Sequence, residues 1–159
     1  MNIFFLDRDP ATCAEYHCDK HVSKMIVEYA QLMSTAHHEH GSTLAPQCYQ
    51  RTHVNHPSAV WARDSADHYS WLFELFVHLN GVYTQRYRRI HLTFDKLVGV
   101  IKNAPILIPD AGWCDPPQCM PDEFKGTDTV TAYRNYYCGG KSFARWQHSP
   151  APDWFKLEV

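Results

Sequence analysis

Five polar residues recur at helical spacing near the start of the chain, and their side chains could transfer protons or bind an anion. They are His17, His21, Lys24, Glu28 and Gln31. At 3.6 residues per turn, all five project from one face of a helix. Histidine is well suited to proton transfer near neutral pH, and a carboxylate beside a lysine can act as an acid or a base. The spacing therefore predicts a reactive face, although a face that merely meets solvent would show the same period.

One continuous helix from Thr12 to His37 is expected to carry this face. Asp9 and Pro10 open it, since the proline suits an early helical position and either Asp9 or Thr12 can cap the helix, and Gly41 ends it. The opposite side of the helix is apolar, with Val22, Met25, Ile26, Tyr29, Ala30 and Met33. This apolar side is expected to face the core and to leave the His–Lys–Glu face available to a ligand.

The rest of the pattern predicts a mostly α protein, a single compact helical domain over residues 1–159 with a long proline-rich loop. Further helices are expected over residues 58–63, from 64–67 to 85–89, over 94–102 and over 127–138. Residues 1–7 are strongly apolar and are expected to form a brief strand or an extended segment through the core. Residues 103–126 contain five prolines, and a loop of that length within a compact domain is often functional.

Composition excludes several classes of protein. Hydrophobic residues make up 45% of the chain, which excludes wholesale disorder. No apolar run approaches the length of a membrane span or a signal peptide, so we expect a cytoplasmic protein without a membrane partner. A formal net charge of −2 argues against binding of nucleic acid by bulk charge. The basic residues nevertheless cluster from Arg86 onward, which leaves room for a local basic surface.

The six cysteines are expected to be reduced thiols, because disulfides are rare in the cytoplasm. Two cysteine-containing segments have spacings near those of zinc ligands, namely Cys18-Asp-Lys-His21 and the pair Cys114 and Cys119. Neither segment is a Cys-x-x-Cys pair. We therefore predict no metal and no cofactor, with structural zinc as the alternative.

Two further segments carry side chains suited to contact with nucleic acid. Asn55 and His56 precede a proline at an expected helix start, where they could bind an anion or cap the helix. Near the end of the chain, aromatic rings and cations alternate, a pattern that suits stacking on bases and contact with phosphates. Those residues are Tyr133, Arg134, Tyr136, Tyr137 and Lys141. Simple packing of the rings is the alternative interpretation.

The order of these motifs resembles the phage pyrimidine-dimer DNA glycosylases of the endonuclease V type. Asp19-Lys-His21-Val followed by Glu28 is similar to that family's Asp-x-His-Leu and its catalytic glutamate at the same interval. Residues 121–126, Pro-Asp-Glu-Phe-Lys-Gly, resemble a Pro-Gln-Glu-Phe-Arg-Gly segment, and residues 133–141 resemble the family's aromatic stretch ending in Tyr-Tyr-Gly-Lys. The overlap spans nearly the whole chain at low identity.

This resemblance implies a DNA N-glycosylase with abasic-site lyase activity, acting in a phage-infected bacterial cell. In that family the N-terminal α-amine attacks the sugar C1′ and forms an imine while a glutamate transfers protons. Carried over, Met1 supplies the amine, Glu28 is the acid and base, and His21 positions the substrate or the leaving group. The implied contacts to substrate or DNA are Asn2, His17, Lys24, Gln31, Asn55, His56, Lys125, Tyr133, Arg134, Tyr136, Tyr137 and Lys141.

Three departures from the family pattern leave other functions open. Two arginines of the family that hold DNA phosphates are replaced by Val27 and Gln31 in this chain, and the arginine that follows the family's N-terminal residue aligns with Asn2. One alternative is an enzyme that acts on a modified base or a free nucleotide with the same scaffold. The other is a non-catalytic phage protein that binds nucleic acid or a host factor. The sequence does not predict an oligomeric state.

Overall fold

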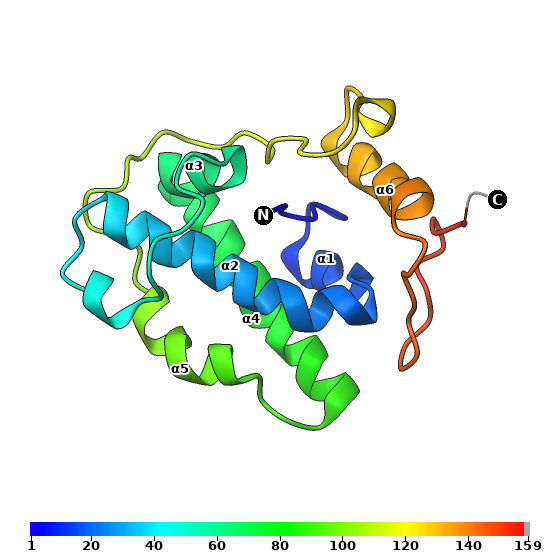
Figure 1. Ribbon diagram of the computed structural model, residues 1–159, viewed down its shortest axis with the longest axis horizontal. Helices are drawn as coiled ribbons and strands as arrows, with labels where there is room; N and C mark the ends of the chain where they lie inside the picture. Colours follow the sequence, from blue (N-terminus) through cyan, green and yellow to red (C-terminus); the bar gives the residue numbers. More distant parts are fainter. Residues whose placement is uncertain (158–159) are drawn as a thin grey trace.

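Two long helices, α2 (Asp19–Glu39) and α4 (Ala66–Tyr87), pack against each other at the centre of the computed structural model, which describes residues 1–157 (Figure 1). Helix α1 (Pro10–Tyr16) packs on α4, and α3 (Pro57–Asp64) and α5 (Leu92–Ile101) each contact both long helices. Helix α6 (Thr129–Gly140) lies on the other side of the molecule from α3 and α5. Two short 3₁₀ turns span Ala45–Gln47 and Asp122–Phe124, and residues 1–157 contain no strand. The predicted mostly α fold is confirmed.

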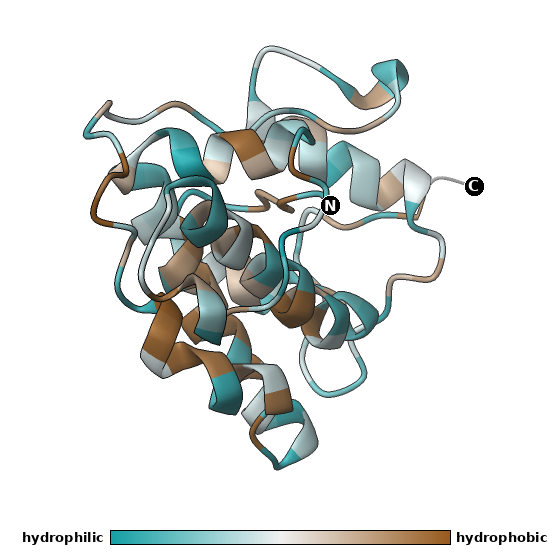
Figure 2. Ribbon diagram, turned by 60° about the vertical axis from the view of Figure 1, so that its left-hand side comes forward, coloured by the Kyte–Doolittle hydropathy of each residue, from teal (hydrophilic) through white to brown (hydrophobic). Residues whose placement is uncertain are grey.

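The apolar core lies among these helices, and Figure 2 shows hydrophobic residues on several of them. The predicted core side of α2 is confirmed, since Val22, Ile26 and Met33 are fully buried. The first residues form an extended segment through this core rather than a strand, and Ile3, Phe5 and Leu6 are fully buried in it. Burial of this kind fixes the position of the chain's first residues, which matters for the site described below.

The prediction of one helix over residues 12–37 is wrong, because the chain breaks at His17 and Cys18 between α1 and α2. His17 has extended backbone angles (φ −61°, ψ 129°). The buried Arg86 side chain donates to the carbonyls of Glu15 and His17 and to the Asp19 carboxylate, at 2.9–3.0 Å. A cation from α4 therefore satisfies the carbonyls at the end of α1 that a continuous helix would have satisfied internally.

His17 consequently does not share the solvent-facing side of α2 and is fully buried. Its Nδ1 donates to the Cys13 carbonyl at 2.7 Å, so its Nε2 accepts from the Tyr29 hydroxyl, also at 2.7 Å. The Tyr29 oxygen in turn accepts from the backbone N–H of Phe4 at 3.2 Å. This chain of hydrogen bonds links α1, α2 and the N-terminal segment. His17 therefore has a structural role.

Acid is expected to destabilise the protein well above the pH range in which carboxylates titrate. Burial lowers the pKa of His17 from 6.5 to about 4, and burial together with nearby cations lowers that of His21 to about 2. Below pH 6.5 the unfolded chain binds protons at both positions while the folded chain does not, so stability falls as the pH falls. Each histidine is expected to cost about 2 kcal/mol at pH 5.

Urea unfolding at pH 7.5 and at pH 5 measures this effect. The variant His17→Gln should show a smaller pH dependence than the native protein, whereas His78→Gln, at an exposed position on α4, should leave the dependence unchanged. An unfolding free energy that does not change between the two pH values would contradict the burial of neutral histidines.

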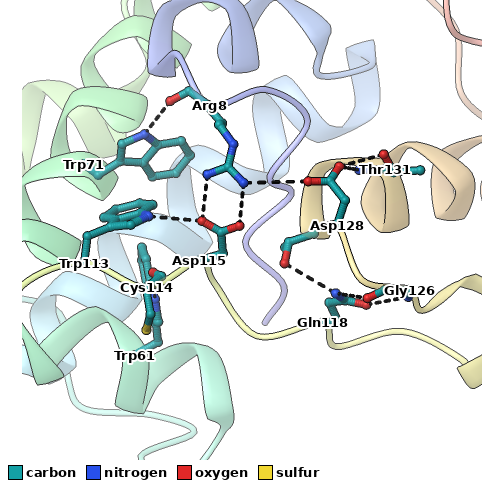
Figure 3. A network of polar contacts seen from close by, with 11 residues as sticks. Arg8, Trp61, Trp71, Trp113, Cys114, Asp115, Gln118, Gly126, Asp128 and Thr131 are labelled. Carbon is teal, nitrogen blue, oxygen red and sulfur yellow. Dashed lines mark hydrogen bonds and ion pairs between the residues drawn. The ribbon is translucent and has the colours of Figure 1, made fainter.

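The proline-rich stretch over residues 103–126 runs from α5 along α3 to α6, and side-chain contacts hold its second half, residues 114–126 (Figures 1 and 3). Arg8 donates two hydrogen bonds to the Asp115 carboxylate at 2.8 and 2.9 Å. Trp61 donates to the carbonyl of Cys114, and the Cys114 N–H donates to the His68 Nε2. Gln118 bonds both backbone groups of Gly126. This long loop is thus ordered by contacts with the helices and with itself.

Two helix ends differ from the prediction. The helix that became α2 was expected to end at His37, but it continues to Glu39, and His37 is fully buried and bonds Ser42 and Tyr69. Helix α6 was expected to stop before Gly139, but both glycines belong to its last turn. The Gly140 position lies against the Tyr136 ring, where a Cβ atom would come within 2.6 Å. A close approach of backbone to ring therefore explains why a glycine occupies this position.

Candidate active site at the N-terminus

The N-terminal residue borders a pocket of about 210 Å³. The pocket is formed by the N-terminal segment, the exposed side of α2 and the residues that follow α6. Its lining residues are Met1, Asn2, Phe4, Lys20, His21, Lys24, Glu28, Lys141 and Phe143. Six of these, Met1, Asn2, His21, Lys24, Glu28 and Lys141, were singled out from the sequence. The fold therefore brings together residues from before the first helix, from α2 and from after the last helix.

The α-amine is positioned through Phe4, three residues further along the chain. The Phe4 N–H donates to the Tyr29 hydroxyl, and its carbonyl accepts from the Cys13 thiol at 3.1 Å. The Phe4 ring itself is buried and stacks on His21 with the ring centroids 4.2 Å apart. Both backbone groups and the side chain of Phe4 are thus held. The Met1 α-amine can therefore move only as far as the short segment before Phe4 allows.

His21 is a neutral hydrogen-bonding group in this pocket. Its Nδ1 lies 2.6 Å from the Tyr137 hydroxyl, and its ring packs between Phe4 and Phe143. Burial, and then the nearby positive charges, lower its pKa to about 2. At neutral pH the imidazole therefore carries no charge, so it can orient a ligand through hydrogen bonds but does not contribute an electrostatic attraction to an anion.

The charged groups of the pocket are predominantly positive. Lys20, Lys24 and Lys141 join the α-amine, and Glu28 is the single carboxylate among the nine lining residues. The Lys20 ammonium lies 4.5 Å from the centre of the Phe143 ring, and that of Lys141 lies 4.4 Å from the Tyr136 ring. These contacts hold the flexible side chains at the rim. A chain with a net charge of −2 thus has a local site suited to anions.

Comparison with known proteins adds nothing to this geometry. The chain matches no family model, and it has no significant match among curated proteins or solved structures. Any assignment of function therefore rests on the pocket itself and on the physical chemistry of its residues.

Several residues predicted to contact DNA are buried instead. His17, Tyr133 and Tyr137 have no exposed surface, so their predicted contact with a ligand is corrected to a supporting role. The Tyr133 hydroxyl donates to the Pro117 carbonyl at 2.6 Å and so ties α6 to the proline-rich loop. The Tyr137 hydroxyl is hydrogen-bonded to the His21 imidazole. Full burial agrees with the alternative interpretation of both rings, simple packing.

Arg134 supports the N-terminal segment rather than projecting to a ligand. It donates to the Leu6 carbonyl at 2.9 Å and pairs with the Asp7 carboxylate at 3.2 Å. Its guanidinium also lies over the Trp154 ring at 5.2 Å. Tyr136, the remaining aromatic of this group, is half-buried and contacts Lys141. It therefore reaches the pocket through that lysine and through the Phe4 ring, whose centroid lies 6.4 Å from its own.

The other predicted contacts lie away from the pocket lining. Lys125 forms an exposed ion pair with Asp122 at 2.9 Å. Gln31 is half-buried on α2, and Asn55 is exposed in the turn before α3. His56 caps α3 by accepting from the Ser58 N–H at 3.1 Å. Burial and then the charge of the α-amine lower the pKa of His56, so this imidazole lies within electrostatic range of the N-terminus.

Three lining residues were missed by the sequence analysis, namely Phe4, Lys20 and Phe143. Lys20 could have been found, since it precedes Lys24 by one helical turn. Phe143 follows the last helix, where no periodicity indicates which side chains turn inward. Within residues 1–157, no group of three or more His, Cys, Asp or Glu side chains is arranged to hold a metal ion, and no helix is long and apolar enough to cross a membrane.

Proposed function

We propose that this protein is a DNA N-glycosylase with abasic-site lyase activity. The observation that carries the proposal is the shared pocket of the Met1 α-amine, the Glu28 carboxylate and the neutral His21 imidazole, with three lysines around them. An amine that must attack a sugar carbon needs a neighbouring group that can exchange protons, and a substrate with phosphates needs nearby cations. All of these groups are present in one small volume.

In the proposed reaction the neutral α-amine of Met1 attacks C1′ of the damaged nucleotide and the bond to the base breaks. The base leaves with the electron pair of that bond, and it takes up a proton. The resulting adduct opens to an imine between Met1 and the sugar. Glu28 then removes a proton from C2′, and the electrons expel the 3′ phosphate by β-elimination. Hydrolysis of the imine releases the cut strand and restores the amine.

Moving the amine tests this proposal. Two extra residues in front of Met1 place the new α-amine outside a pocket of about 210 Å³, so cleavage of an oligonucleotide that contains an abasic site should fall to background. The same two residues added after Val159 serve as the control and should leave cleavage unchanged. Equal cleavage by both extended proteins would rule out the Met1 amine as the nucleophile.

Lys141→Gln is expected to weaken binding of the same oligonucleotide without removing catalysis. The ammonium is a rim cation held over Tyr136 at 4.4 Å, so its loss should raise the KM by about three- to tenfold, as expected for one partly exposed charge. The kcat should stay within about twofold. Steady-state cleavage at low and high salt measures both values, and a variant that loses kcat with an unchanged KM would assign Lys141 to the chemical step instead.

The main alternative is an enzyme that acts on a free nucleotide with the same groups. The net charge of −2 favours it, because a small substrate does not need an extended basic surface. A free nucleotide that competes with the oligonucleotide at equal concentration, and that is itself converted, would select this alternative.

A further inference from the structure

A second and larger pocket of about 440 Å³ lies beside the first, between α2 and the end of α4. Its lining residues are Asp19, Lys20, Ser23, Lys24, Tyr83, Tyr87 and Arg89. Lys20 and Lys24 also line the pocket at the N-terminus. The two pockets therefore adjoin each other across these two lysines, and a ligand longer than one sugar can occupy both.

Two aromatic rings provide the apolar part of the second pocket. Tyr83 and Tyr87 lie with their ring centroids 5.0 Å apart. Tyr83 is nearly buried, whereas Tyr87 is only half-buried and so presents ring surface to a ligand. His148 packs edge-on against Tyr87 at 5.7 Å, and burial raises the pKa of the Tyr87 phenol. The ring is thus held in place and neutral, as stacking on a flat heterocycle requires.

The charges around these rings are positive on balance. Lys20, Lys24 and Arg89 are cations, and the Arg89 Nε donates to the Tyr83 hydroxyl at 3.0 Å. Asp19 is the one carboxylate of the lining, and its two oxygens are already bound by Arg86 and by the N–H of Gln147. Its charge is compensated inside the protein, so the pocket attracts an anion. Aromatic surface beside uncompensated cations fits a ligand that has both a flat ring and a phosphate.

We infer that this second pocket binds a nucleotide, with the base on Tyr87 and the phosphate near Lys24 and Arg89, and that this nucleotide is the neighbour of the abasic sugar in the same strand. The placement of the sugar rests on the proposed function. The shared lysines then contact the phosphate between the two units. A nucleotide that is not joined to the sugar has the same chemistry, and the experiment separates the two sources.

Binding of two fluorescent probes tests the inference. The first probe is a dinucleotide in which 2-aminopurine is joined to a tetrahydrofuran abasic analogue, and the second is 2-aminopurine deoxynucleoside monophosphate. Stacking on Tyr87 should quench both, and the joined probe should bind at least about tenfold more tightly. Equal affinity for the two probes would overturn the placement in the same strand and would assign the pocket to free nucleotides.

Substitutions in the second pocket should weaken binding of the joined probe. Tyr87→Leu removes the ring but keeps an apolar side chain, and Arg89→Gln removes an exposed cation; each should raise the Kd by about tenfold. Arg88→Gln is the matched control, because Arg88 is exposed next to the pocket without lining it, and its Kd should not change. Native affinity in both pocket variants would overturn the inference. Arg89 lies at the surface, so this test does not depend on the stability of the Tyr87 variant.

The outcome is distinguishable from that of the proposed function. The tetrahydrofuran analogue has no C1′ leaving group and cannot form an imine, so its binding does not depend on the Met1 amine. Probe binding that is sensitive to Tyr87 and Arg89, in a protein without cleavage activity, would support the nucleotide pocket and reject the lyase. Cleavage activity, together with probe binding that is unchanged in the Tyr87 and Arg89 variants, would support the lyase and reject the nucleotide pocket.

Discussion

Glu28→Gln is expected to lower cleavage at an abasic site by at least about 100-fold, while the protein stays folded. The glutamine has nearly the same shape but cannot exchange a proton, and general acid–base catalysis typically contributes 100- to 10,000-fold. Glu28 is half-buried on α2 and is the single carboxylate of its pocket. No other acidic side chain of the lining can therefore take over its role.

Single-turnover cleavage and the affinity for the uncleavable tetrahydrofuran oligonucleotide should be measured on the same preparation. The variant should bind at least as tightly as the native protein, because a negative charge near the phosphates has been removed. Glu74→Gln, at an exposed position on α4, is the control and should cleave normally. Cleavage by Glu28→Gln within threefold of the native rate would remove Glu28 from the mechanism.

Arg86→Met is expected to destabilise the protein by about 3–5 kcal/mol, the usual cost of removing one partner of a buried ion pair. The Arg86 side chain is 2% exposed and the Asp19 side chain 15%. Its loss leaves the Asp19 carboxylate without its cation and the carbonyls of Glu15 and His17 without their donors. This cluster fixes the start of α2, which carries Lys20 and His21. Loss of Arg86 should therefore disrupt the pocket at the N-terminus as well as destabilise the protein.

Urea unfolding at pH 7.5 measures the change in the free energy of unfolding. Arg86→Lys should fall between the native protein and the methionine variant, since the ammonium keeps the charge but cannot match three acceptors with a planar fork. Arg88→Met, at the exposed end of the same helix, should change stability by less than about 0.5 kcal/mol. A loss below 1 kcal/mol for Arg86→Met would show that the break between α1 and α2 does not depend on the cation.

Local sequence patterns were sufficient to predict most of the helices. Ser65 caps α4 and Asp128 caps α6 with their side chains, and Pro57 occupies the first position of α3. Helical periodicity also placed Lys24 and Glu28 on the same exposed side of α2. These features depend on neighbours within one or two turns, so they can be inferred from the order of residues alone.

Features that depend on residues distant in the chain could not be predicted. The period of polar residues continues through His17, yet the helix breaks there because Arg86, 69 residues away, bonds its carbonyl. The aromatic stretch near the C-terminus gives no sign of which rings face inward. Tyr137 is buried because its hydroxyl meets His21, 116 residues away, whereas Tyr136 next to it remains half-exposed. Long-range packing decides such cases.

Reductive trapping is the most direct test of the central claim, that the Met1 amine forms an imine with the sugar. The untagged protein is mixed with an oligonucleotide that contains an abasic site, in the presence of borohydride, and the adduct is digested and analysed by mass spectrometry. We expect a covalent adduct on the α-amine of Met1, absent from protein with two residues added in front of Met1. An adduct on Lys24 or Lys141, or no adduct with folded protein, would contradict the proposed mechanism.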